Sequence, residues 1–373
     1  MSQAELRVVN GSVVALRLFD IAYAIDLARV EALWAAHAGT ASSRSRLSTT
    51  SPKAVAFDVP PVVLSLDSVA LELEGAPVSA EVTARLYDFG VVSLALRVNA
   101  DGKSWSEFTR LLNALDQAAG PGARNGVWQT LLSHLRPLVA PALTRATVST
   151  LEEDYLLGVV HQLSEPISAA VLQERVDLIP LLSGERRQLS ESAQRDLLRH
   201  RFSYYTDDLV ALTWDRAFIY EPRGDSDVDD VLEVANAQLL ELRYYDELLD
   251  DELPRMYDLV EETRRAQYLL APSRYSKLAR KLYTLVAEVT ELTEKVDNAL
   301  QVTEDVYLAR VYAAALELFR VPNVSAAVDR KLAIIRDTYT ALNDEASGSR
   351  TELLAIAVVV LIVAEIVLAL LRY

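Results

Sequence analysis

The C-terminal end of the chain carries the feature that most restricts its fold. Residues 353–371 read LLAIAVVVLIVAEIVLALL and hold 14 leucine, isoleucine and valine residues in 19 positions. As an α-helix this run is about 28 Å long, close to the ~30 Å hydrocarbon core of a bilayer. A helix buried in a globular domain usually shows a polar stripe, and this run has no polar residue between Glu352 and Glu365. The run therefore predicts a C-terminal transmembrane helix.

Glu365 is the one charged residue of the predicted span. The apolar residues favour insertion by roughly 4 to 8 kcal/mol, whereas one acid costs at most about 3 kcal/mol. We expect Glu365 to be protonated there, because a low dielectric disfavours the carboxylate. Its helical neighbours Leu361 and Ile362 cannot pair with it. One interpretation is an oligomer contact made by Glu365, Ile362 and Leu361. The other is a tolerated acid that reaches towards the interface.

The residues around the run predict a topology. Only Arg372 and Tyr373 follow it, which is typical of a tail-anchored, single-pass membrane protein. Arg336 and Arg350 precede the run, and this slight positive excess places the soluble part on the cytoplasmic side. The first 20 residues contain acids and an arginine in their apolar stretch, which argues against a signal or transit peptide. We expect a bacterial inner membrane in preference to a mitochondrial one, with the lipid bilayer as a partner.

The composition excludes several function classes. Lys+Arg 37 against Asp+Glu 53 gives a net charge of −16, and such an acidic surface is repelled by nucleic-acid phosphates. We therefore expect no DNA partner. The chain has no cysteine, so disulfides, thiolate metal sites and cysteine nucleophiles are excluded.

Residues 1–222 are predicted to form an α+β head. Short runs of alternating or continuous apolar residues predict strands, and hairpins are predicted over 79–99 and 207–222. A strand, a helix and a closing hairpin thus occur twice in the same order. The fold class that we expect is α+β, with two related α+β units and a possible internal duplication of 12–99 and 152–222.

Residues 225–346 predict long helices in an antiparallel hairpin or coiled coil. The helix that opens at Pro272 has apolar residues spaced alternately four and three positions apart, which is a heptad seam: Leu278, Leu282, Leu285, Val289, Leu292, Val296 and Ala299. Asp246 falls near the seam of the preceding helix, where a polar residue can set the register or pair with an arginine. Residues 347–352 are predicted to be a flexible linker.

No catalytic constellation is visible in the sequence. The letters DFG at 88–90 lack the other kinase motifs, and no nucleotide-binding glycine loop is present. The four histidines do not share metal-ligand spacing. We therefore predict no catalytic, cofactor-binding or metal-binding residue. Arg195, Arg199 and Arg201 form a possible anion patch, although the acidity of the chain favours a solvated surface.

The order of these features resembles the family named for the "required for meiotic nuclear division" proteins. The resemblance is carried by the strand YDFGVV at 87–92, the helix LLELRYYDELLDDEL at 239–253 and the apolar tail with Glu365. It implies a membrane-anchored protein that oligomerises, with mitochondrial members that support translation by holding ribosomes near the inner membrane. It implies no catalytic residue. The acidic composition and the missing transit peptide depart from that pattern.

Three functions remain as alternatives. The first is a tail-anchored, oligomeric scaffold or interaction protein that binds itself through its helices. The second is a membrane tether for ribosomes or nascent chains that uses the basic clusters, and the third is an enzyme with an unrecognised site in the α+β head. The first is preferred, and we expect the protein not to be an enzyme and to need no cofactor.

Overall fold

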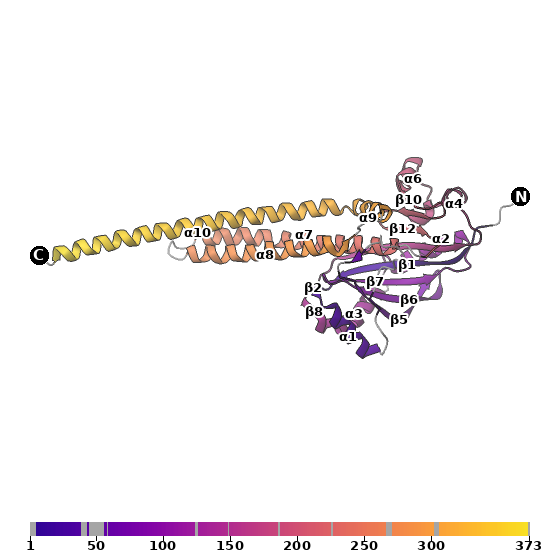
Figure 1. Cartoon of the computed structure of the whole chain (residues 1–373), viewed down its shortest axis with the longest axis horizontal. Helices are drawn as coiled ribbons and strands as arrows, with labels where there is room; N and C mark the ends of the chain where they lie inside the picture. The colour runs from indigo at the N-terminus through magenta and orange to yellow at the C-terminus, as the bar shows by residue number, and fades with distance from the viewer. Residues whose placement is uncertain are drawn as a thin grey trace. The chain divides into compact units, whose positions relative to one another are not determined.

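The computed structural model describes residues 5–38, 43–44, 56–57, 59–123, 126–147, 149–185, 187–224, 227–265, 271–301 and 306–371. The chain divides into two compact units. The first, the α+β unit, comprises Met1–Tyr244 and Lys295–Pro322, and the second, the helical unit, comprises Tyr245–Glu294 and Asn323–Tyr373. The predicted combination of mixed α+β structure with long helices is confirmed at this level (Figure 1).

A nine-stranded sheet forms the frame of the α+β unit, in the order β10-β11-β12-β9-β1-β7-β6-β5-β3. β12 runs parallel to β9, and the other pairings described in this sheet are antiparallel. Two short ladders, β2-β8 and β13-β4, are added. The strands are β1 (Val8–Asp20), β2 (Ala22–Ile25), β3 (Ser43–Arg44), β4 (Ala56–Phe57), β5 (Val62–Leu73), β6 (Ala76–Leu86), β7 (Val91–Asn99), β8 (Leu143–Ala146), β9 (Glu152–Leu163), β10 (His200–Phe202), β11 (Leu209–Leu212), β12 (Arg216–Tyr220) and β13 (Leu300–Gln301).

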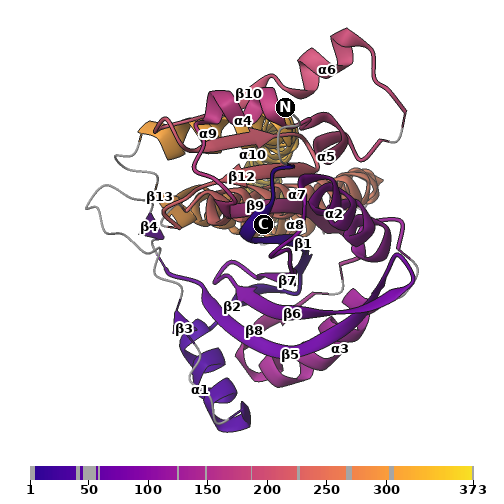
Figure 2. The same cartoon turned by 90° about the vertical axis from the view of Figure 1, so that its right-hand side faces the viewer.

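Helices pack against this sheet. The residues of α2 (Trp105–Ala119), α3 (Val127–Val139) and α5 (Ile179–Ser183) share one apolar core with alternate residues of the strands, such as Val13 and Ala15. α1 (Leu27–Ala38) packs on α3 and β5. Figure 2 shows strands β9, β1, β7, β6 and β5 following one another across the unit, with α2 and α3 beside them. The shorter helices are α4 (Ala169–Arg175), α6 (Glu191–Leu197) and the 3-10 turn η1 (Ala140–Ala142).

The first part of α7 (Val228–Arg265) is joined to the sheet by buried polar groups. Arg85 of β6 forms ion pairs with Asp230 at 2.5 Å and Glu233 at 3.2 Å, and the Tyr87 hydroxyl donates to Glu233 at 3.0 Å. Burial raises the pKa of the Glu233 carboxyl, and the adjacent Arg85 opposes this shift. α9 (Val306–Leu318) leads to Phe319, whose ring meets the Tyr155 ring edge-on at 5.2 Å. Charged groups in this interface therefore have partners.

Local sequence explains where α2 begins and where the chain turns between β6 and β7. Ser104 caps α2 through its hydroxyl, and Glu107 accepts a hydrogen bond from the Ser104 backbone, which is a capping box. The predicted hairpin over 79–99 is confirmed as β6 and β7. Its turn needs Gly90, which has a φ of 102° and lies where a Cβ would come 1.7 Å from the Ala22 carbonyl oxygen.

The helical unit contains the end of α7, α8 (Ala271–Ala299) and most of α10 (Val321–Leu371). In each of its three helices, apolar side chains spaced three, four or seven positions apart are buried. They are Leu249 and Met256 of α7, Leu278, Leu282 and Val289 of α8, and Val328, Leu332, Ile335 and Leu342 of α10. Of the predicted α8 seam, Leu285 is half-buried, and the side chains of Leu292, Val296 and Ala299 lie outside the described residues.

The predicted membrane span is wrong. Within the ranges that the structure describes, no helix combines the length and the apolar character needed to cross a membrane. The run 353–371 is the last part of α10, a helix of 51 residues that also carries the polar residues of 344–352. The tail anchor, the cytoplasm-facing topology and the inner-membrane location depended on that span and are corrected with it.

The predicted linker at 347–352 is also wrong, since α10 passes through it without a break. Gly348 disfavours a helix by only about 1 kcal/mol, and no proline follows Pro322 to end it. The unit boundary differs as well, because the α+β unit includes α7 as far as Tyr244 and takes back Lys295–Pro322.

The internal duplication is not supported by the strand directions. β7, which closes the first segment, pairs antiparallel with β1, whereas β12, which closes the second, pairs parallel with β9. Two copies of one unit would pair their first and last strands in the same sense. The two segments instead form one continuous sheet.

Candidate functional site

An open groove of about 1540 Å³ lies in the α+β unit along β5. One wall is strand β5, and the other walls come from α1, the end of α2 and α3. The described residues that line it are Trp34, His37, Val63, Ser65, Leu66, Asp67, Ser68, Val69, Ala70, Leu71, Glu72, Gly75, Gln117, Ala118, Val127, Thr130, Leu131, His134, Leu135 and Leu138. Segments far apart in sequence thus form one concave surface.

The groove has an apolar floor and a polar rim. Leu71, Leu131 and Leu135 are buried, and several half-buried valines and leucines extend the floor. Asp67 and Glu72 are exposed on the rim, and no lysine or arginine occurs among its described lining residues. The surface therefore suits an apolar ligand that carries positive charge.

The helical walls are fixed by two tryptophans. Trp34 of α1 is 8% exposed and lies 6.2 Å from the His37 ring. Trp128 of α3 donates its indole N–H to the Ala119 carbonyl oxygen at 2.6 Å, which joins α3 to the end of α2. Rigid elements therefore hold the walls, as a binding site requires.

The outer edge of β5 is largely uncovered within the described ranges. β3 pairs only with Val62 and Val63, whereas β6 pairs with β5 along most of its length. A register shift lies between Leu66 and Val69. Residues 64–73 of β5 therefore present one edge of backbone N–H and C=O groups beside the groove, which is where an additional strand can pair.

The titratable groups of the groove do not form a catalytic pair. In the part of the chain that is described, no hydrogen bond joins His37, His134, Asp67 and Glu72 to one another, and no group of histidine, aspartate and glutamate is placed to hold a metal ion.

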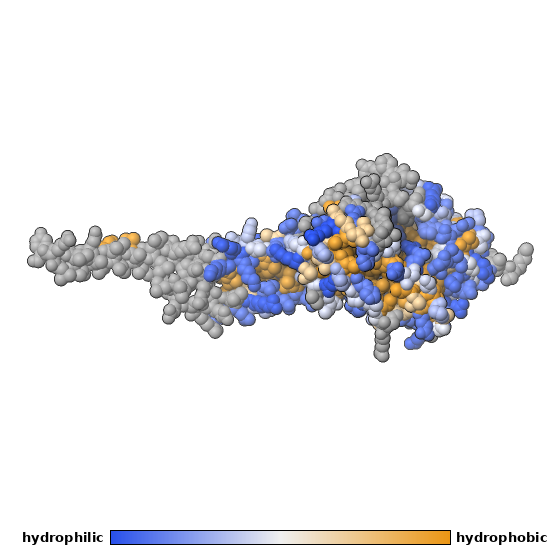
Figure 3. Space-filling model, turned by 90° about the horizontal axis from the view of Figure 1, so that it is seen from below, coloured by the Kyte–Doolittle hydropathy of each residue, from blue (hydrophilic) through white to orange (hydrophobic). Residues whose placement is uncertain are grey.

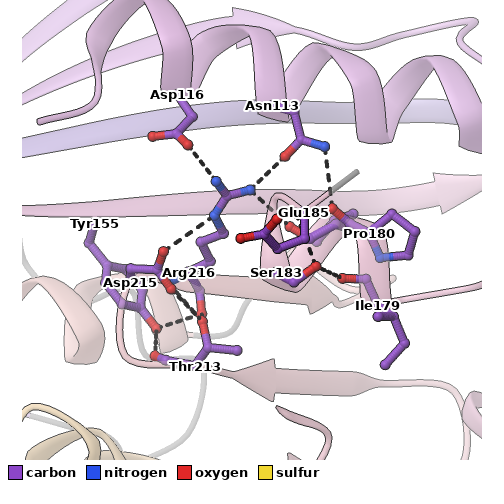
Figure 4. A network of polar contacts seen from close by, with 11 residues as sticks. Asn113, Asp116, Tyr155, Ile179, Pro180, Ser183, Glu185, Thr213, Asp215 and Arg216 are labelled. Carbon is purple, nitrogen blue, oxygen red and sulfur yellow. Dashed lines mark hydrogen bonds and ion pairs between the residues drawn. The ribbon is translucent and has the colours of Figure 1, made fainter. Parts of the chain in front are cut away.

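A second polar centre, around Arg216, lies on the same face as α2 (Figure 4). Its guanidinium donates to Asp116 at 2.5 Å, to Asn113 at 2.6 Å and to the Leu181 carbonyl oxygen at 3.2 Å. Asp215 lies 3.5 Å from its Nε. Arg216 is 3% exposed, so this centre fastens β12 to α2 and α5.

The residues around Arg216 leave space for its guanidinium. Gly184 has a φ of 64°, and a Cβ there would lie 2.3 Å from the guanidinium. The Tyr155 hydroxyl lies 2.9 Å from the carbonyl oxygens of both Thr213 and Arg216. Burial raises the pKa of Asp215, and the adjacent Arg216 opposes that shift. Because both terminal nitrogens of the guanidinium donate to α2 and α5, the contacts of this centre hold the fold together.

The predicted anion patch is placed at the β10 edge of the sheet and its three side chains are exposed. Arg195 donates to the Glu191 carbonyl oxygen of its own helix, and Arg201 donates to Gln173 at 2.6 Å. Arg199 is exposed just before β10. The structure thus brings Arg199 and Arg201 to one edge, while part of the hydrogen-bonding capacity of Arg195 and Arg201 is already used.

Aromatic side chains that the sequence analysis did not single out lie at the same edge. Tyr204 and Tyr205 are 63% and 46% exposed, and their rings meet edge-on at 4.7 Å. The Arg223 guanidinium lies 3.8 Å over the Tyr205 ring, and that of Arg310 lies 5.7 Å over the Phe202 ring. This edge therefore combines positive charge with accessible rings.

In the helical unit, Asp246 faces a cation on another helix of the same chain. Lys331 of α10 donates to Asp246 Oδ1 at 2.6 Å and lies 2.6 Å from Asp250 Oδ1. Desolvation by burial lowers the pKa of the Lys331 amine, but the hydrogen bonds and charges of Asp246 and Asp250 together outweigh it, so the pKa is raised. The partner is a lysine, where an arginine was expected, and the contact links α7 to α10.

The predicted oligomer contact is described only in part. The side chains of Leu361 and Glu365 lie outside the described residues. Ile362 is 51% exposed, and Val358 and Val359 are 53% and 58% exposed. Figure 3 shows apolar side chains, in orange, reaching the surface among polar ones on the face seen from below. α10 therefore presents uncovered apolar side chains.

Sequence reasoning missed the groove and the Arg216 centre. The groove depends on β5 and on helical residues that lie 26 (His37 to Val63) to 75 (Val63 to Leu138) positions away along the chain, and no local pattern reports such an arrangement. A usable signal was present for Arg216, since it lies within the otherwise apolar strand RAFIY. A buried arginine in a strand indicates a nearby carboxylate.

Fold and site together define a mixed α+β protein with a groove along one sheet edge and a separate helical unit. The chain belongs to the family described as "Uncharacterized protein MJ0711, N-terminal domain", which matches residues 10–227. It is similar to the uncharacterized protein MJ0711 of Methanocaldococcus jannaschii, with 27% identity over 219 residues. That match covers 58% of this chain and 66% of the relative, which is just under two thirds of the relative's length.

No solved structure matches the chain. The matched range covers most of the α+β unit and ends just before α7. The family and the relative carry no described activity, and neither links the chain to the meiotic nuclear division family, so that resemblance stays a prediction.

Proposed function

We propose that this protein is an oligomeric scaffold, or interaction protein, whose copies associate through the C-terminal part of α10. The observation that carries the proposal is the exposure of Val358, Val359 and Ile362, each more than half accessible, on a long helix. Burying one such side chain fully is worth about 1.5 to 3 kcal/mol relative to leaving it in water.

The sequence around these residues supports a second copy as the occupant. The run 353–371 is apolar on all sides apart from Glu365, and helices of that kind are buried in natural proteins. Two copies of the same helix cover the same residues on each other, so one set of side chains completes both halves of a symmetric contact.

The test uses the full chain and measures its mass in solution by light scattering. The wild type is expected to form discrete multimers, and Val358→Glu with Ile362→Glu is expected to dissociate them. Ala333→Glu is the matched control, because Ala333 is exposed on the same helix and the same side chain is introduced. A monomeric wild type at ~10 μM, the range of moderate affinities, contradicts the proposal.

The second candidate function is a tether for ribosomes or nascent chains. The observation that favours it is the β10 edge, where Arg199, Arg201 and Arg223 lie with exposed tyrosines, since arginines and rings together suit RNA. Co-sedimentation with ribosomes should then weaken with salt and be lost in Arg199→Glu with Arg201→Glu. No association at low salt contradicts it.

A further inference from the structure

We propose that the groove along β5 binds an extended peptide segment of a partner protein, one that alternates apolar and basic residues and pairs as an additional strand with β5. This inference goes beyond the self-association proposed above and does not depend on it, because the groove is in the α+β unit and Val358 and Ile362 are in the helical unit.

The backbone of β5 provides the first argument. Residues 64–73 lack a second partner strand in the described ranges, because β3 covers only Val62 and Val63. An extended peptide can pair there through main-chain hydrogen bonds, which supply affinity without specifying sequence. Ten residues of strand span about 30 Å, so a partner segment of similar length fits.

The floor of the groove provides the second argument. Leu66, Val69 and Leu71 of β5 line it together with Leu131 and Leu135 of α3. Side chains of a paired strand point alternately to its two faces, so every second residue of the peptide would lie over this floor. The apolar residues of the partner therefore recur at every other position.

Charge complementarity predicts which residues occupy the other alternate positions of the peptide. Asp67 and Glu72 lie exposed on the rim, and no described lining residue is a lysine or arginine. Basic side chains of the peptide would reach these carboxylates, whereas acidic side chains would be repelled in a chain whose net charge is −16.

The volume favours a peptide over a small ligand. Small-molecule pockets measure roughly 300 to 1,000 Å³ and enclose most of their ligand. The groove is about 1540 Å³ and is open. An extended peptide, with one side left in water, matches both the large volume and the openness of the groove.

The experiment measures binding of a fluorescent ten-residue peptide that alternates valine with lysine to the full chain, by fluorescence anisotropy. Two control peptides separate the arguments: one replaces every lysine with glutamate, and one carries N-methyl groups on alternate amides, which removes backbone donors but keeps the side chains. We expect binding of the first peptide and at least ~10-fold weaker binding of both controls, in line with the loss of main-chain or charge contacts.

Variants of the protein locate the site. Glu72→Lys and Asp67→Lys should each weaken binding several-fold at low salt. Glu174→Lys is the matched control, because Glu174 is exposed on α4 in the same unit but outside the groove, and it should bind like the wild type. A comparable loss in Glu174→Lys would assign the binding to overall charge and overturn the proposal.

Three other results would also overturn the proposal. The first is no binding of the valine–lysine peptide at about 1 mM, which marks the limit of weak affinity. The others are binding of the glutamate peptide, or of the N-methylated peptide, that equals binding of the valine–lysine peptide. The same titration with the Val358→Glu and Ile362→Glu variant separates the two proposals. If that variant is monomeric and still binds the peptide, both stand. If the wild type is monomeric and binds, only self-association fails.

Discussion

The two ends of the nine-stranded sheet are built by different physical means. Towards β10, the sheet is held by buried charge, with Arg216 fastening β12 to the helices α2 and α5. Towards β5, it is held by apolar packing of hairpin strands, and among the described residues the outer side of β5 pairs only at Val62 and Val63. The β10 edge exposes arginine and tyrosine, whereas the β5 edge exposes carboxylates above an apolar floor.

This difference predicts which residues can be substituted without loss of stability and can therefore form a binding surface. Around Arg216 the buried polar groups bind one another, so substitutions of these residues should change stability. At the β5 end the groove residues are half-buried and have unoccupied space before them, so substitutions there should change binding with little effect on stability. The predictions below test this division.

The largest effect is expected from Arg216→Met. It keeps the length of the side chain and removes the cation, which leaves Asp116, Asp215 and a buried carbonyl oxygen without their donor. Breaking a buried ion pair costs about 3 to 5 kcal/mol, and the partial exposure of both aspartates places this case at the low end. Urea unfolding can be followed by tryptophan fluorescence, because Trp34, Trp105, Trp128 and Trp214 all belong to the α+β unit.

Arg187→Met is the control for this change, since Arg187 is exposed and the same side chain is introduced. It should alter the free energy of unfolding by no more than about 0.5 kcal/mol. If Arg216→Met costs as little as Arg187→Met, the β10 end is not held by its buried charge.

Much of the local structure could be predicted from the sequence. The hairpin over 79–99 and the start of α8 at Pro272 follow from turn residues and from helix-start chemistry, which depend on a few adjacent residues. The seam of the helical unit follows from heptad spacing for the same reason. These features are local, so a single sequence contains them.

The remaining features depend on contacts between distant residues. Neither strand sequence alone determines whether β12 pairs parallel or antiparallel with β9. The duplication was predicted from the order of elements, and the strand directions do not support it. The groove likewise exists only after β5 and α3 have packed. The span prediction was wrong, since no helix within the described ranges is long and apolar enough to cross a membrane.

An intermediate, pH-dependent effect is expected at Asp20, the last residue of the central strand β1. Its carboxyl is 4% exposed, and burial raises its pKa to about 6, against the opposing hydrogen bond from Thr147. Between pH ~4 and 6 the folded state keeps a proton that the unfolded state has released, so stability falls as pH rises through this window. Asp20→Asn mimics the neutral acid and should stabilise the unit by about 2 kcal/mol at pH 8, with almost no effect at pH 4.

Asp337→Asn serves as the comparison for Asp20→Asn, because Asp337 is exposed on α10. It should leave the pH dependence of the tryptophan-detected unfolding unchanged. A stabilisation by Asp20→Asn that is equal at both pH values would show that the buried carboxylate is not the cause.

The smallest effect on stability is expected at the groove. Val69 is half-buried on its floor, whereas Val82, on β6, is 2% exposed. Valine to threonine keeps the shape and adds a hydroxyl, which costs about 1 to 3 kcal/mol where it is buried without a partner and a few tenths where water reaches it. Val82→Thr should therefore destabilise the α+β unit measurably, and Val69→Thr should not. Val69→Thr should nevertheless weaken binding of the valine–lysine peptide, because the hydroxyl makes the floor of the groove polar. Equal destabilisation by the two substitutions would mean that the β5 end is as closely packed as its neighbour and has no open floor to offer.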